Sequence, residues 1–261
     1  MVNKTLTVKA PSVTSPIQVV TLADKDGNII NSFGAAANIP ISAGDVEGFS
    51  HVNKFGATDG DITSGTVWDG NNAAVAYPYP ADSVVAVAST QNSGAAVLVQ
   101  GLDANRIAAS ETINIGATGS TVFSRIFRAN MVDTNNDADV SLTMGGTVAA
   151  KIIEDKAQTL MAVYTVPAGK TGYLLKLQMG SDKASTNAAL KYTLMARDTD
   201  NGNVFQIKGI SYAAGGQSVV VEYPVPLKFE EQTDIRVDVI ASSGGQTCSA
   251  TFDLILVDNR S

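Results

Sequence analysis

The sequence predicts an all-β protein with two β-sandwich-like domains, the C-terminal one jelly-roll-like, and an extended N-terminal arm. Apolar residues make up 44% of the 261 residues and charged residues 16%, which is enough apolar surface for a large core. Residues 171–179 and 189–197 alternate apolar and polar side chains at a period of two, as half-buried strands do. The 23 glycines suit many tight turns, and no long amphipathic helix pattern is present.

The N-terminal part of the chain is predicted to be irregular. Residues 1–16 are mostly polar and include Pro11 and Pro16, so we expect an extended arm, either disordered or bound to a neighbouring subunit. Residues 17–154 form the expected N-terminal β domain, which opens with a hairpin turning at Asp24–Gly27. Residues 34–81 are rich in Gly, Asn and Asp and end in two closely spaced prolines, which predicts a long irregular loop.

Short apolar runs predict a strand meander in the rest of this domain. The expected strands lie at 83–89, 95–100, 111–115, 140–144 and 147–154. Residues 121–130 are ambiguous, because the i, i+4 spacing of Phe123 and Phe127 also describes one helical turn.

The C-terminal sandwich is expected to span residues 155–261, after a boundary at Glu154–Ala157. Val166-Pro167-Ala168-Gly169 is a turn signal and predicts a hairpin at the centre of this domain. Strands are expected at regular intervals, at 160–166, 171–179, 189–197, 204–210, 218–229, 233–241 and 247–257. Seven or eight strands with this spacing predict a sandwich of jelly-roll type.

Charge and cysteine content exclude several classes of function. The formal charge is −7, and Arg125 and Arg128 form too short a basic cluster to bind nucleic acid. Cys248 is the only cysteine, so neither an intrachain disulfide nor a cysteine metal site is expected, and we interpret it as an inert strand residue. No apolar run approaches the roughly 18 residues that span a membrane, so we expect a protein made soluble in a cytoplasm.

The residues that usually carry chemistry form no recognisable site. A Ser-His-Asp triad would need His51, the only histidine, but no G-x-S-x-G motif is present, so we expect a polar surface or interface residue. The loop Asp133–Asp139 resembles a calcium loop, yet Ala138 and Met144 occupy its sixth and twelfth positions. We therefore favour a hydrated loop at this position, and the alternative is a loop that binds a stabilising calcium ion. No catalytic residue, cofactor or metal ligand is therefore predicted, nor enzymatic activity.

Three aromatic residues of the irregular segment are candidates for contact with a partner. Trp68, Tyr77 and Tyr79 lie beside proline and glycine, and such rings bury much area at little entropic cost. The alternative is that they cap the core of the N-terminal domain. The sequence leaves both interpretations open.

Several short segments of the chain resemble a family of tailed-phage and prophage virion proteins. They are spread in order over residues 55–258 and comprise Phe55-Gly56, Asp61-Ile62, Val67–Gly70, Tyr77–Pro80, Val97–Asp103, Ser110–Thr112, Gln158–Ala162, Tyr164–Thr171, Pro226–Phe229 and Phe252–Asp258. The chain departs from the family pattern at Asn71–Ala74, where a more glycine-rich run is usual, so that loop is not assigned a shared role.

The resemblance implies a non-enzymatic structural protein of the virion, made in the host cytoplasm. With the acidic, β-rich chain, it favours a capsid decoration or cement protein that binds the major capsid protein as a trimer or dimer, each contact burying about 1,000 Å² or more. The alternative is a neck, tail or fibre component that contacts an adaptor or a host glycan. A polysaccharide depolymerase would need a pair of carboxylates that no local pattern identifies.

Overall fold

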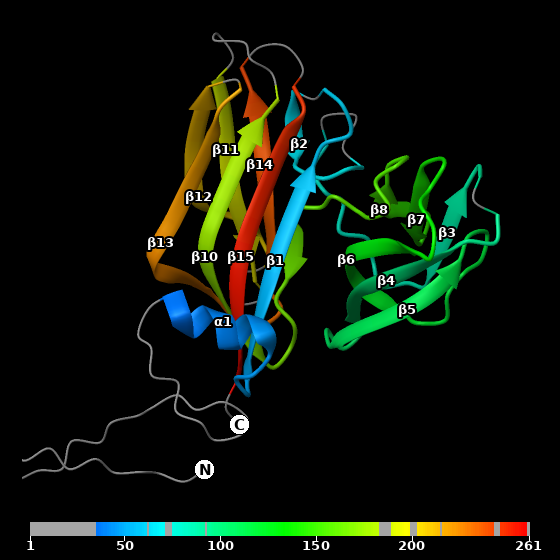
Figure 1. Ribbon diagram of the computed structural model, residues 1–261, viewed down its shortest axis with the longest axis horizontal. Helices are drawn as coiled ribbons and strands as arrows, with labels where there is room; N and C mark the ends of the chain where they lie inside the picture. Colours follow the sequence, from blue (N-terminus) through cyan, green and yellow to red (C-terminus); the bar gives the residue numbers. More distant parts are fainter. Residues whose placement is uncertain are drawn as a thin grey trace, which may run out of the picture.

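The computed structural model describes residues 35–259 except 62, 71–74, 92, 183–188, 199–202, 215 and 243–245. The predicted arm 1–16 and the predicted hairpin after it lie outside the described residues. Within them the chain forms one helix, α1 (Ala35–Ala43), and fifteen strands (Figure 1). The strands are β1 (Phe49–Ala57), β2 (Ser64–Thr66), β3 (Val85–Ser89), β4 (Ala96–Asp103), β5 (Ala108–Asn114), β6 (Phe123–Val132), β7 (Val140–Met144), β8 (Thr147–Ile152), β9 (Val163–Thr165), β10 (Lys170–Ser181), β11 (Ala189–Arg197), β12 (Gln206–Ala214), β13 (Ser218–Phe229), β14 (Asp234–Ala241) and β15 (Cys248–Asp258).

The larger domain is a jelly roll made of two facing antiparallel sheets. One, the β15 sheet, has the order β1-β15-β10-β13, and the other, the β14 sheet, has the order β12-β11-β14-β2 with β9 also on β14. Hydrogen bonding joins β1 to β15, β2 to β14, β10 to β13 and β11 to β12. This nested pairing of first strand with last is the double Greek key of a jelly roll. The all-β, sandwich-like prediction is confirmed.

Alternation along these strands builds the core between the two sheets. On β11 the inward side chains Leu190, Tyr192 and Leu194 are almost fully buried, and on β14 Val237 and Val239 lie beside them on the same face of the sheet. Burying one such side chain contributes roughly 1.5–3 kcal/mol relative to leaving it exposed. The intervening residues point away from the core and form the outer faces of the sheets.

The smaller domain is inserted between β2 and β9 and has its own core. It consists of the three-stranded sheets β3-β7-β8 and β5-β4-β6, and Figure 1 shows it standing beside the jelly roll. Of residues 121–130, ambiguous in sequence, those from Phe123 onward belong to strand β6, with Phe123 fully buried.

The structure divides the chain differently from the predicted boundary at Glu154–Ala157. Residues 49–66, which the prediction gave to the N-terminal domain, supply β1 and β2 of the jelly roll. The prediction of an irregular loop over 34–81 is wrong here, because all nine residues of β1 pair with β15. These partners lie about 200 residues away, so no local pattern could reveal the pairing.

The predicted hairpin around Val166–Gly169 is also wrong. The turn exists, with Gly169 at a φ of 74°, which a glycine adopts readily. However, β9 before it pairs with β14, whereas β10 after it pairs with β13 and β15. The turn therefore carries the chain from one sheet to the other.

Candidate functional site

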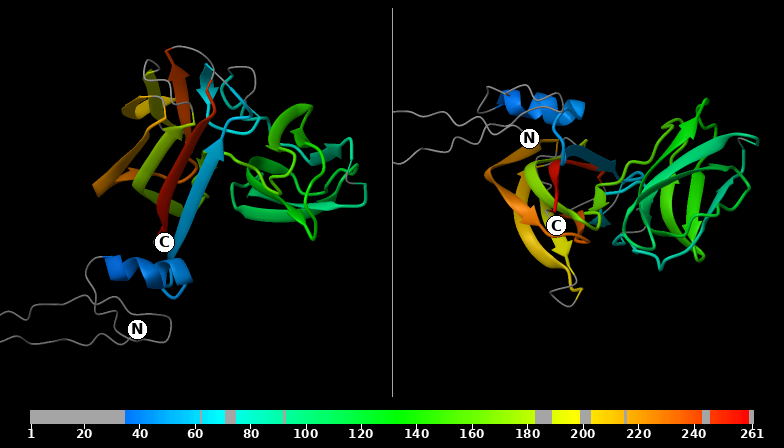
Figure 2. Two further views of the ribbon diagram at one scale, coloured as in Figure 1. Left: turned by 45° about the horizontal axis from the view of Figure 1, so that its top comes forward. Right: turned by 90° about the horizontal axis from the view of Figure 1, so that it is seen from below.

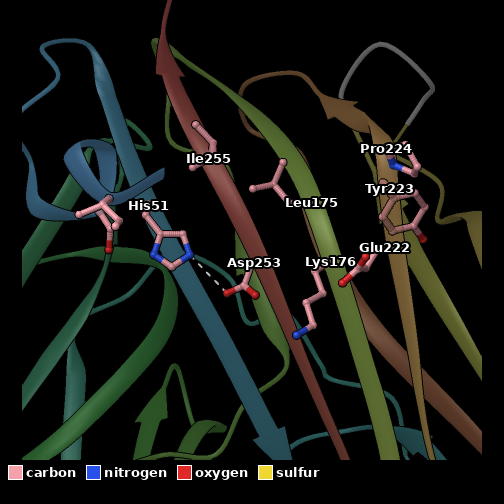
Figure 3. Close-up of a pocket in the computed structure, with 10 residues that line it drawn as sticks. His51, Leu175, Lys176, Glu222, Tyr223, Pro224, Asp253 and Ile255 are labelled. Carbon is pink, nitrogen blue, oxygen red and sulfur yellow. Dashed lines mark hydrogen bonds and ion pairs between the residues drawn. The ribbon is translucent and has the colours of Figure 1, made fainter. Parts of the chain in front are cut away.

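A groove of about 720 Å³ lies on the outer face of the β15 sheet, beside α1 (Figure 3). Strands β1, β15, β10 and β13 form its floor, and Ile39 and Ser42 of α1 close one end. The helix ends at Ala43 because Gly44 adopts a left-handed φ of 79°. The second view in Figure 2 shows α1 crossing this side of the jelly roll, with the inserted domain to one side.

A β-bulge gives the groove its apolar floor. Leu174 pairs with Leu227 and Lys176 with Glu222, so residues 223–226 of β13 lie opposite the single Leu175. Two of those four residues, Pro224 and Pro226, have no backbone N–H to leave unpaired, which suits an irregular edge strand. The apolar side chains that line the groove are Ile39, Leu175, Tyr223, Pro224 and Ile255.

Charged and polar side chains cross the same face in one row. The strand register aligns Asn53, Asp253, Lys176 and Glu222 across the four strands, and Lys176 lies between the two carboxylates (Figure 3). Asn53 Nδ2 donates to Asp253 Oδ1 at 2.7 Å, and His51 Nε2 lies 3.3 Å from the same oxygen. His51 and Asn53 therefore share one carboxylate oxygen of Asp253 on this face of the sheet.

His51 is thus a partly exposed residue at the surface groove, as a polar surface residue would be. Ser42 lines the same groove, but none of the hydrogen bonds found between described residues joins it to His51. The groove can bind an apolar segment flanked by charges of either sign.

The predicted partner-contact residues Trp68 and Tyr77 lie in the core of the inserted domain, each 3% exposed. Trp68 packs edge-on against Tyr77, with ring centroids 5.0 Å apart, and Tyr77 against Tyr79 at 4.8 Å. The Tyr77 hydroxyl donates to the carbonyl of Ala149 at 2.8 Å, and burial raises the pKa of that hydroxyl. The three rings pack together, with Trp68 and Tyr77 in the core and Tyr79 partly buried against it. Trp68 and Tyr77 therefore fit the alternative interpretation, that these rings cap the core, rather than a surface contact.

A buried ion network joins the two domains. Arg125 of β6 donates to both carboxylate oxygens of Asp234 on β14, at 2.8 and 2.9 Å. The same carboxylate accepts from Thr165 Oγ1 at 2.6 Å and from Arg197 Nε at 2.9 Å. Burial alone would raise the pKa of Asp234, but the hydrogen bonds and charge of Arg125, with those of Thr165 and Arg197, hold it below its usual value. The Arg197 guanidinium also lies 4.5 Å from the centre of the Tyr79 ring.

Lys54 is a second buried charge near this junction. Its Nζ donates to the carbonyl of Phe127 on β6, although Lys54 belongs to β1 of the jelly roll. Burial, and after it the charge of Arg128, lowers the pKa of Lys54 to about 7.

The outer face of the β14 sheet is the surface that sequence reasoning missed. Ile207, Ile210 and Tyr212 of β12 and Ile240 of β14 are all exposed. The sequence did contain an indication of this surface. Apolar residues occur at both odd and even positions of 204–214, whereas a strand with one solvent-facing side needs them at alternate positions only.

The remaining candidates of the sequence are structural. Asn136 holds the loop Asp133–Asp139, donating to Ile153 O at 2.8 Å and accepting from Ala157 N at 2.9 Å. No group of three or more His, Cys, Asp or Glu side chains is placed to hold a metal ion in the described part of the chain. Cys248 is buried on β15, and burial raises the pKa of its thiol to about 11. The described helix α1 is too short to cross a membrane.

Comparison with known proteins adds little to this description. No family model matches the chain, and no curated protein matches it. Among solved structures, a chain of infectious bursal disease virus, Gt strain, is 12% identical with a TM-score of 0.21 over 82% of this chain and 73% of that chain. A chain of the Gx strain is 10% identical with the same TM-score, over 82% of this chain and 76% of that one. Similarity this low supports no argument, so the assignment of a jelly roll rests on the strand pairing alone.

Proposed function

We propose that the protein is a structural component of a tailed-phage virion, a decoration protein that binds the major capsid protein on the outer surface of the head. The groove on the β15 sheet carries this proposal. It combines an apolar floor with a charged rim, the anatomy of a protein–protein contact, rather than converging reactive groups. The short segments along residues 55–258 that resemble virion proteins support the same class of function.

The junction between the domains suits such a role. Packaged DNA pushes capsomers apart, and a clamp across them opposes that force only if its two ends move together. The Arg125–Asp234 pair crosses the junction with two parallel hydrogen bonds, an arrangement that fixes orientation as well as distance. This pair therefore opposes relative movement of the two domains, as a bridge between neighbouring capsomers would require.

The decisive experiment counts copies of the protein in purified virions by quantitative mass spectrometry and locates them by cryo-EM. A decoration protein is expected in numbers that match the capsomers, on the outside of the head. A copy number of about a dozen would refute this proposal and favour the neck, tail or fibre alternative, because those parts follow the low cyclic symmetry of the tail axis.

Variants then test whether the groove is the contact. Leu175→Asp places a charge on the apolar floor, and we expect it to reduce binding of the purified protein to heads that lack it. Ile107→Asp is the control, because Ile107 is exposed on the inserted domain, away from the groove. Equal binding by both variants would show that the groove is not the capsid contact.

A further inference from the structure

The strand register collects exposed apolar side chains on the outer face of the β14 sheet. Tyr212, Lys191 and Ile240 form one row across β12, β11 and β14. The next row is Ile210, Thr193 and Asp238, and the third is Ile207, Met195 and Arg236. We call Ile207, Ile210, Tyr212 and Ile240 the apolar face.

These side chains are far more exposed than the inward residues of the same sheet. Tyr212 is 68% exposed, Ile207 55%, Ile240 53% and Ile210 45%, whereas the inward residues of β11 and β14 are almost fully buried. Together the four present on the order of 400–500 Å² of apolar surface, at the size at which patches on monomers are often functional. In the described part of the chain these four side chains stay exposed, whereas Arg236, at the end of the third row, packs against Phe205 with its guanidinium 4.1 Å from the ring centre.

The area matches what a dimer requires. A standard interface takes about 800 Å² from each partner, of which a little over half is apolar. The apolar face supplies that apolar share. Lys191 and Met195, which lie between its members and are partly exposed, add polar and mixed surface, whereas Thr193 is buried.

The charges of this face favour a second copy of the same chain. Two molecules of charge −7 repel each other over most of their surface. Here the only carboxylate in the three rows, Asp238, is paired with Arg236 at 3.0 Å and accepts from Thr66 Oγ1 at 2.6 Å. Lys191 can lay its aliphatic stem along the apolar surface and keep its ammonium group in water. Two copies can therefore meet here without opposing uncompensated carboxylates.

The shape of the face suits the same partner. Sheets pack face to face about 10 Å apart, and a two-fold axis brings the same patch of both copies together. The inserted domain stands beside the jelly roll, and α1 lies on the side of the other sheet (Figure 2). We propose that the protein forms a two-fold dimer through the apolar face of its β14 sheet.

The test is the mass of the purified full-length chain in solution, measured by light scattering and sedimentation over micromolar concentrations. The wild type is expected at twice the chain mass of 27.0 kDa. Ile207→Lys and Tyr212→Lys, both at exposed positions, are each expected to weaken dimerisation at least about tenfold. Ile107→Lys is the matched control, because Ile107 is 56% exposed, as Ile207 is, but lies on the inserted domain. Circular dichroism confirms that each variant is folded.

Each outcome decides the proposal. A monomeric wild type overturns it, as does a dimer that survives both substitutions or that Ile107→Lys disrupts equally. If the wild-type chain is monomeric and the apolar face instead binds phage heads, the occupant is a particle protein and the dimer is refuted. The proposal is independent of the virion role, because Leu175→Asp in the groove is expected to leave the dimer intact.

Discussion

Removing the carboxylate of Asp234 is the most informative perturbation of the junction between the domains. Asp234→Ala takes the counter-ion from two guanidinium groups at once. Arg125 is nearly buried, so its charge cannot be rehydrated without opening the junction. Breaking a buried ion pair in this way costs about 3–5 kcal/mol. Arg197 is partly exposed and stays near the Tyr79 ring, so we expect it to add little.

The assay is thermal and urea unfolding of the wild type and the variant. A loss of about 3–5 kcal/mol lowers the melting temperature by roughly 10 °C for a chain of this size. The control is Lys170→Gln, which removes the surface pair with Asp258 and is expected to cost at most about 1 kcal/mol. In the Asp234→Ala background, Arg125→Met is expected to restore stability, because it removes the charge that has lost its partner.

The pH dependence gives an independent check. Because the pKa of Asp234 is lowered in the folded protein, the unfolded chain binds more protons below about pH 4. The stability from this group is therefore present above about pH 4 and is lost as the pH falls through the folded pKa. The difference between wild type and Asp234→Ala should shrink over that range. A loss no larger than that of Lys170→Gln, or no rescue by Arg125→Met, would refute the reasoning.

Three further changes test other parts of the structure. Between about pH 7 and 10 the unfolded chain keeps a proton on Lys54 that the folded protein has lost, so the free energy of unfolding should rise by up to about 1.4 kcal/mol per pH unit. In urea titrations across this range Lys54→Met should lack that rise, and parallel curves would contradict the buried amine. Gly56→Ala would place its Cβ 2.2 Å from a backbone nitrogen of the neighbouring segment, and we expect a loss of about 1–3 kcal/mol by urea unfolding. Gly180→Ala meets nothing closer than 3.6 Å and serves as its control, so equal stability of the two variants would contradict the close approach. Tyr77→Phe removes a buried hydrogen bond to a backbone carbonyl and should cost about 1–3 kcal/mol, whereas Tyr173→Phe at a partly exposed position of β10 should leave the melting temperature unchanged. Similar melting temperatures for those two variants would argue against the buried bond.

The sequence by itself determined the class of fold and most of its strands. The alternation at 171–179 and 189–197 lies inside β10 and β11, and the run at 218–229 coincides with β13. These strands can be predicted from sequence because one face packs on a core and the other faces water. Apolar and polar side chains therefore alternate at the strand period of two.

Only the tertiary structure decided which strands pair and which surfaces stay open. The turn at Val166–Gly169 was predicted from sequence, but β9 and β10 on either side of it belong to different sheets. Trp68 and Tyr77 had two interpretations until the core of the inserted domain was visible around them. The register of β12, β11 and β14 likewise collects Tyr212 and Ile240 on one face. Neighbouring residues fix local geometry, whereas pairing and burial depend on contacts between residues up to about 200 positions apart, which no window of sequence contains.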